Sequence, residues 1–100
     1  MEERREHGAL ENLLVLDLSR VVAGPFCGAI LGDLGARAIK IEVPKRGDDA
    51  RAYAPHVNGE SAYFANLNRN KEGITLNLKS EKGKQIFLEL VKKADILIEN

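Results

Sequence analysis

The chain has 100 residues, of which 44% are hydrophobic and 30% are charged, a composition typical of soluble globular proteins. Its formal net charge is zero at pH 7, and no apolar run approaches the ~20 residues that span a bilayer, so we expect neither nucleic acid nor a membrane as a partner. The single cysteine has no His or Cys at metal-ligand spacing and fits a reducing compartment, so we expect a cytoplasmic protein without a metal ion.

Residues 1–12 begin with a charged stretch that no hydrophobic segment follows, which predicts a disordered tail ahead of an α/β domain over residues 13–100. An almost continuous apolar run over residues 13–18 predicts a strand covered on both faces, as in a parallel sheet. Asp17 interrupts this run near its carboxyl end, where open α/β sheets bind ligands. We expect its carboxylate to accept hydrogen bonds from amides of the next loop.

A helix is expected from Pro25 to about residue 34. Proline suits the first helical position because its φ is fixed and its missing N–H is not needed there. Gly35 is a natural C-terminal cap. The free amides around Ala23 and Gly24 would then face the preceding loop, where a helix N-terminus favours an anion such as phosphate.

Glycines recur every four residues in this helix, at Gly24, Gly28 and Gly32, and fall on one face. Each weakens the helix by ~0.8–1.0 kcal/mol relative to alanine, so the pattern indicates that a neighbouring element approaches this face closely. Cys27 stands in an apolar context one turn into the helix, which favours an inert residue of the core.

Alternating apolar residues predict a second strand over residues 37–42 and a third over residues 74–79. Between them lies a long irregular stretch with a short helix or turn around residues 61–66. Arg69, Lys71 and Lys79 flank the third strand and are candidates for holding phosphate groups.

Ser80 is expected to cap the next helix, which a last strand over residues 95–99 follows. The apolar residues of that helix predict a buried stripe: Ile86, Phe87, Leu90, Val91 and Ala94. The order of elements predicts an incomplete doubly wound, Rossmann-like parallel α/β sheet, because nothing follows the last strand to cover it. No residue pattern in the chain indicates a catalytic group.

Two long segments together resemble the opening of the class III coenzyme A transferases, the family of the formyl-CoA and carnitine CoA-transferases. They are VLDLSRVVAGPFCGAILGDLGARAIKIEVPKRGDDAR and SAYFANLNRNKEGITLNLKSEKGKQIFLELVKKADILIEN. The chain departs from the family pattern at Glu72 and Gly73, at Asn77, and at Val43, where some members carry an arginine that contacts adenine.

The resemblance implies transfer of CoA from an acyl-CoA to a free carboxylic acid, through an aspartyl intermediate on a nucleophile that lies downstream of this chain. By itself this chain is therefore expected to be inactive, while the full-length enzyme is expected to be a homodimer. The residues that match the family's CoA-binding positions are Val22, Ala23, Leu76, Lys79 and Asn100.

Three alternatives stay open at the level of sequence. An α-methylacyl-CoA racemase shares the fold and the CoA site but moves a proton. The chain is otherwise a non-catalytic remnant that binds CoA weakly or associates with a full-length partner. A generic nucleotide binder fits least, because the glycine spacing is not the dinucleotide fingerprint G-x-G-x-x-G.

Overall fold

The structure is a computed structural model that describes residues 8–100, so the part of the predicted tail over residues 1–7 lies outside the described residues. Its elements in chain order are β1 (Leu14–Asp17), α2 (Ala23–Asp33), β2 (Arg37–Glu42), the 3-10 helix η1 (Asp49–Ala52), β3 (His56–Val57), β4 (Glu60–Ser61), α3 (Ala62–Leu67), β5 (Lys71–Thr75), α4 (Glu81–Lys93) and β6 (Ile96–Ile98).

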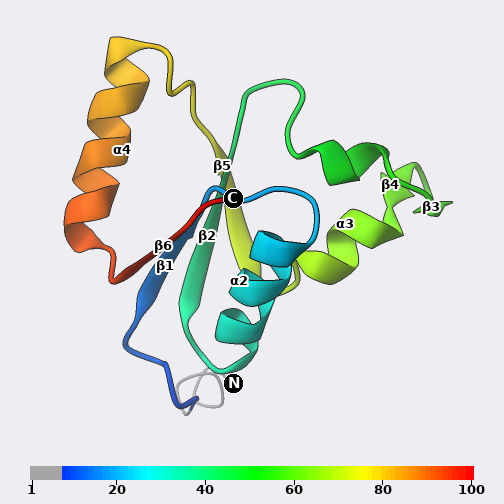
Figure 1. The fold of residues 1–100 in the computed structure, drawn as a ribbon, viewed down its shortest axis with the longest axis horizontal. Helices are drawn as coiled ribbons and strands as arrows, with labels where there is room; N and C mark the ends of the chain where they lie inside the picture. The colour runs from blue at the N-terminus through cyan, green and yellow to red at the C-terminus, as the bar shows by residue number, and fades with distance from the viewer. Residues whose placement is uncertain (1–7) are drawn as a thin grey trace.

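The main sheet has four parallel strands in the order β5-β2-β1-β6. Figure 1 shows α2 on one side of this sheet and α4 on the other. The predicted parallel α/β architecture is therefore confirmed. Because β2 and β5 lie to one side of β1 and β6 lies to the other, the strand order reverses between β1 and β6. In open parallel sheets, ligands bind beyond the carboxyl ends of the strands at such a reversal.

The core lies between α2 and the sheet. Val15, Ala36 and Ala38 form a buried cluster, and half-buried apolar side chains pack against it: Leu10, Leu13, Leu31, Ile96 and Ile98. The amide of Leu10 donates to Leu34 O at 2.9 Å, so the chain is hydrogen-bonded to the end of α2 before β1 begins. The domain boundary at residue 13 stays a prediction.

Helix α2 begins two residues earlier than expected. Phe26 N donates to Val22 O at 2.8 Å, which closes the first turn with Val22 as the N-cap. Pro25 is therefore in the third helical position instead of the first, where its missing N–H is still tolerated because the early amides of a helix have no intrahelical acceptor. Gly35 follows the helix with φ +108°, in the left-handed region expected at a helix end.

The predicted close approach at the glycine face is confirmed for two of the three positions. A Cβ atom on Gly28 would lie 2.7 Å from Asp17 Oδ2, and one on Gly24 would overlap the Ser19 side chain. At Gly32 a Cβ would make only an ordinary 3.4 Å contact with Asn70 Cβ.

Cys27 is exposed, so its predicted place in the core is wrong. It lies about 100° around the helix from the packed face at Gly28.

The third strand lies earlier than the alternating pattern predicted. Strand β5 pairs with β2 from Lys71 to Thr75, and one further hydrogen bond joins Leu76 N to Glu42 O at 3.0 Å. The chain then turns, because Ser80 N donates to Asn77 O at 3.1 Å. The apolar alternation thus continues for several residues after the ladder has ended.

The predicted capping serine of α4 is confirmed, and a second serine caps α3. Ser80 Oγ accepts from Gly83 N at 3.0 Å at the start of α4, as expected, and Ser61 Oγ accepts from Phe64 N at 3.1 Å at the start of α3. The predicted buried stripe of α4 is right only in part: Phe87, Leu90 and Ala94 are half-buried, whereas Ile86 is 43% exposed and Val91 is 38% exposed.

Candidate functional site

The segment after β1 meets the segment after β6 at the reversal in strand order. Arg20 N donates to Asn100 Oδ1 at 2.9 Å, and Asn100 Nδ2 donates back to Arg20 O at 3.0 Å. Leu18 N also donates to Ile98 O at 2.9 Å. Figure 1 shows the C-terminal end of the chain beside the loop that leaves β1. These bonds connect residues that are 80 positions apart in sequence, beyond the carboxyl ends of the neighbouring strands β1 and β6.

Val22 and Ala23 lie at the start of α2, directly after this loop. Val22 is 45% exposed, and Ala23 is also exposed. No side chain of the described residues caps the helix at Val22, so the amide of the exposed Ala23 has no capping acceptor. Such amides, together with the positive end of the helix dipole, favour an anionic group.

Leu76 and Lys79 lie at the carboxyl end of β5, two strands away from β1. Leu76 is half-buried, and Lys79 is exposed in the turn before α4, where its amide donates to Asn77 Oδ1 at 3.0 Å. Within residues 8–100, Lys79 Nζ has no hydrogen bond or ion pair. Of the five residues that the family resemblance singles out, Asn100 bonds to Arg20, which lies two and three positions before Val22 and Ala23, and Leu76 and Lys79 follow β5, two strands away along the same sheet edge.

The first buried ion pair beneath the loop joins Asp17 to Lys71. Lys71 Nζ lies 2.6 Å from Asp17 Oδ2 and also donates to Asn68 Oδ1 at 2.7 Å and to Pro25 O at 3.0 Å. Burial lowers the pKa of Lys71, and the Asp17 carboxylate opposes that shift. Because Lys71 is 2% exposed and fully engaged, the prediction that it holds phosphate is wrong.

The other carboxylate oxygen of Asp17 supports the loop. Asp17 Oδ1 accepts from Ser19 N at 2.9 Å and from the Ser19 hydroxyl. The predicted role of Asp17 as an acceptor for loop amides is therefore confirmed.

A second buried ion pair, between Lys40 and Asp48, was missed by the sequence analysis. Lys40 Nζ lies 2.8 Å from Asp48 Oδ2 and donates to Ser19 O at 2.9 Å, and the side chains are 3% and 0% exposed. Asp48 Oδ1 accepts from Val21 N at 3.1 Å and from Ala50 N at 2.9 Å. Burial favours the neutral form of Asp48, but the hydrogen bonds from Lys40, Ala50 and Val21 outweigh it and lower the pKa.

Two signals in the sequence pointed to this second pair. Lys40 stands between Ile39 and Ile41 in a strand that is covered on both faces, so its charge needs a partner. Asp48 precedes η1 as its N-cap, a position that buries a carboxylate against backbone amides.

Two arginines of the chain, Arg69 and Arg51, are paired with its own acids. Arg69 Nη2 lies 2.8 Å from Asp33 Oδ2, and this hydrogen bond is the main reason why the pKa of Asp33 is lowered. Arg51 donates to both oxygens of Glu42, at 2.7 and 2.8 Å. These arginines therefore support the structure, and Lys79 is left as the one predicted phosphate ligand whose side chain is free within the described residues.

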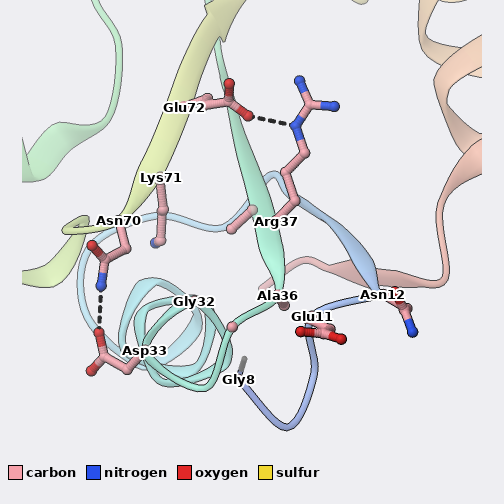
Figure 2. Close-up of a pocket in the computed structure, with 12 residues that line it drawn as sticks. Gly8, Glu11, Asn12, Gly32, Asp33, Ala36, Arg37, Asn70, Lys71 and Glu72 are labelled. Carbon is pink, nitrogen blue, oxygen red and sulfur yellow. Dashed lines mark hydrogen bonds and ion pairs between the residues drawn. The ribbon is translucent and has the colours of Figure 1, made fainter. Parts of the chain in front are cut away.

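A hollow of about 920 Å³ lies at the opposite, amino-terminal end of the sheet, between the end of α2 and strands β2 and β5. Figure 2 shows two bonds between its polar side chains: Arg37 Nε donates to Glu72 Oε1 at 2.6 Å, and Asn70 Nδ2 donates to Asp33 Oδ1 at 2.8 Å. None of the five predicted residues lines it.

A smaller hollow, of about 70 Å³, lies beside the loop after β1, at the edge where parallel sheets bind ligands.

Residues 8–100 contain neither a cluster of metal-binding side chains nor a helix that could cross a membrane. No group of three or more His, Cys, Asp or Glu side chains is arranged to hold a metal ion. No helix in this part of the chain has the length and apolar character needed to cross a membrane.

The chain was compared with known proteins. The family model described as CoA-transferase family III matches residues 10–100. An acetyl-CoA:oxalate CoA-transferase from Acetobacter aceti is 57% identical over 93% of this chain and 24% of its own length, and a succinyl-CoA:glutarate CoA-transferase from Mus musculus is 50% identical over 91% and 21%. A crystal structure of a CAIB/BAIF family protein from Brucella suis superposes with a TM-score of 0.85 at 43% identity, over 93% of this chain and 26% of that one.

The chain thus spans about a quarter of the length of the relatives it matches. The matched residues include β1, β6, the loop between β1 and α2, and both buried ion pairs. The resemblance seen in the sequence is confirmed, and the chain belongs to CoA-transferase family III.

Proposed function

We propose that this chain forms the N-terminal, CoA-binding part of an enzyme that moves CoA from an acyl-CoA to a free carboxylic acid. The observation that carries the proposal is the pair of hydrogen bonds between Arg20 and Asn100, because it joins the loop that leads into α2 to the segment after β6, where the strand order reverses. The relatives named above carry out this class of reaction on oxalate and glutarate.

In the proposed complex, the CoA lies along the carboxyl edge of the sheet. The amides at Val22 and Ala23 face one end of the ligand, where the helix dipole favours a negative charge. Lys79 supplies a mobile positive charge for a phosphate group of the CoA. Leu76 offers apolar contact, and Asn100 holds the loop against which the ligand lies.

The proposed chemistry uses an aspartate outside this chain. Its carboxylate attacks the thioester carbonyl and releases the CoA thiolate, which leaves a mixed anhydride. The thiolate then attacks the aspartyl carbonyl, which releases the donor acid and forms an aspartyl-CoA thioester; the acceptor acid repeats the two steps in reverse. Asp17 and Asp48 are unsuited to this role, because both are buried in ion pairs. Because the exchange is divided into several acyl transfers, each step has a lower barrier than a single direct exchange would have.

Three further features belong to the proposal. We place the enzyme in the cytoplasm, since one free cysteine suits a reducing compartment. The working unit is a homodimer, and the reaction requires no metal ion and no nucleic acid. The chain without the rest of the enzyme is inactive.

The test is an exchange assay on the full natural protein. Acetyl-CoA or succinyl-CoA is incubated with oxalate or glutarate, and the new acyl-CoA is measured by mass spectrometry, with the acceptor acid omitted as the control. Formation of oxalyl-CoA or glutaryl-CoA that depends on the acceptor supports the proposal. Exchange of the α-proton of a 2-methylacyl-CoA for deuterium, without CoA transfer, would indicate a racemase instead. CoA binding without either reaction would indicate a non-catalytic remnant.

A second measurement addresses the intermediate. The protein is incubated with acyl-CoA alone and quenched, and its intact mass is compared with that of the untreated protein. A mass increase equal to CoA minus water, removed by hydroxylamine, is expected for an aspartyl-CoA thioester. Transfer without any such adduct would contradict the covalent route.

A further inference from the structure

The backbone of Val21 adopts a conformation that the loop cannot be expected to keep by itself. Its φ is +71°, in the left-handed region, which a β-branched residue rarely enters because its side chain clashes with the backbone. Such strain persists only where the surroundings hold the residue in place. Val21 directly precedes the N-cap of α2, so its conformation sets the direction in which the chain enters that helix.

The group that holds Val21 comes from a distant part of the chain. Asp48 Oδ1 lies 3.1 Å from Val21 N, although 27 positions separate the two residues. Lys40, which is ion-paired with Asp48 at 2.8 Å, donates to Ser19 O at 2.9 Å. The pair therefore hydrogen-bonds to the loop at Ser19 and at Val21. These residues stand on either side of Arg20, the residue that bonds to Asn100.

The burial of this pair is informative. Both side chains are almost completely buried, and replacing a buried ion pair by apolar residues of similar volume is often neutral or stabilising. Stability alone therefore does not require these charges. What an apolar pair could not supply is an acceptor for Val21 N and a donor to Ser19 O, the two bonds that hold the loop from the side of β2.

We propose that Asp48 is a positioning residue for CoA: together with Lys40 it holds the loop over residues 19–22 in the shape that presents the first amides of α2 to the ligand. Asp48 itself touches no ligand. The inference rests on the proposed function, namely that this loop and the start of α2 bind CoA.

Three variants of the full natural protein test it. Asp48→Asn keeps an acceptor for Val21 N and removes the ion pair, and the double variant Lys40→Met with Asp48→Leu removes both loop bonds while leaving no buried charge unpaired. Asp33→Asn is the control, because it breaks an ion pair at the other end of α2, where both side chains are 38% exposed and the loop over residues 19–22 is not involved. The readouts are the Kd for CoA, the KM for acyl-CoA and for the acceptor acid, kcat, and hydrogen exchange in a peptide over residues 18–24.

We expect the Kd for CoA and the KM for acyl-CoA to rise about tenfold in Asp48→Asn and further in the double variant, because displaced binding groups lose much of their interaction with the ligand. The KM for the acceptor acid is expected to stay unchanged. Hydrogen exchange over residues 18–24 should become faster in both variants and remain unchanged in Asp33→Asn.

The outcomes separate the two proposals. If Asp48 only stabilised the fold, its variants would reduce the active fraction and hence the apparent kcat, with the Kd and KM of the folded protein unchanged; that result would overturn the positioning role and leave the proposed function standing. Failure of the unsubstituted protein to bind CoA would overturn both. A double variant that folds and binds CoA normally would also reject the positioning role.

Discussion

Lys71 Nζ lies 2.6 Å from Asp17 Oδ2, although the two residues are 54 positions apart and their side chains are 2% and 0% exposed. The contact ties the start of β5 to the end of β1 beneath α2, whose Pro25 carbonyl accepts a further bond from the same ammonium group. The Lys71 side chain thus joins three elements, the strands β5 and β1 and the helix α2.

Removal of this lysine should be strongly destabilising. In Lys71→Met the Asp17 carboxylate would stay buried without its cation, so we expect the free energy of unfolding to fall by about 3–5 kcal/mol. The measurement is urea denaturation, and the control is Lys92→Met, because Lys92 and Glu89 form an exposed pair whose loss should change stability by less than ~0.5 kcal/mol. Equal effects of the two substitutions would contradict a structural role for the buried pair.

Two glycines of α2 should respond oppositely to alanine. In Gly28→Ala the new methyl group would lie 2.7 Å from Asp17 Oδ2 and 3.1 Å from Lys71 Cε, so it would displace the ion pair and destabilise the fold by about 1–3 kcal/mol. In Gly32→Ala the nearest contact is 3.4 Å, so the gain in helix propensity should stabilise the fold by up to ~1 kcal/mol. Thermal unfolding of the two variants tests this, and a stabilising Gly28→Ala would show that the close packing does not hold.

The acid dependence of stability should reflect Glu42 and Asp48. The pKa of Glu42 is lowered from 4.5, chiefly by its hydrogen bonds from Arg51, and that of Asp48 is lowered from 3.8 by hydrogen bonds that outweigh its burial. The unfolded chain therefore binds more protons in acid, so these groups stabilise the fold fully above their unfolded pKa values and lose that contribution as the pH falls through the lower, folded values.

We accordingly expect the free energy of unfolding to decline as the pH falls below 4.5 and then 3.8. The variant Glu42→Gln should show a shallower decline, since one of the two carboxylates no longer titrates. Urea denaturation at a series of pH values measures both slopes. Parallel slopes for the variant and the unsubstituted protein would exclude Glu42 as a source of the acid sensitivity.

Lys79 tests the proposed phosphate contact directly. In the full natural protein, Lys79→Ala should weaken CoA binding by ~1.5–3 kcal/mol, the contribution of a charge-assisted hydrogen bond, without changing the thermal stability, since Lys79 is exposed. Calorimetric titration with CoA gives the Kd, and Lys92→Ala at the other end of α4 serves as the control. An unchanged Kd would remove Lys79 from the site.

Local features of the fold were predictable because they depend on neighbouring residues. The bounds of β2, the capping of α4 by Ser80 and the left-handed Gly35 follow from alternation, from hydroxyl groups at helix starts and from glycine at a helix end. The same local reasoning failed where tertiary contacts decide. The apolar stripe of α4 predicted burial at five positions, but Ile86 is 43% exposed and Val91 is 38% exposed.

The sequence by itself thus determined the α/β class, the family and the place of the first loop at a carboxyl end of the sheet. Only the tertiary structure decided which distant groups meet there: Asn100 with Arg20, Lys71 with Asp17, and Asp48 with Lys40. The physical reason is that the periodicity of apolar residues shows which face of an element is apolar. It does not show which distant residue will pair with a buried polar side chain. A buried charge or a strained loop is stabilised by groups brought to it by the order of the strands, and that order is a property of the packed sheet.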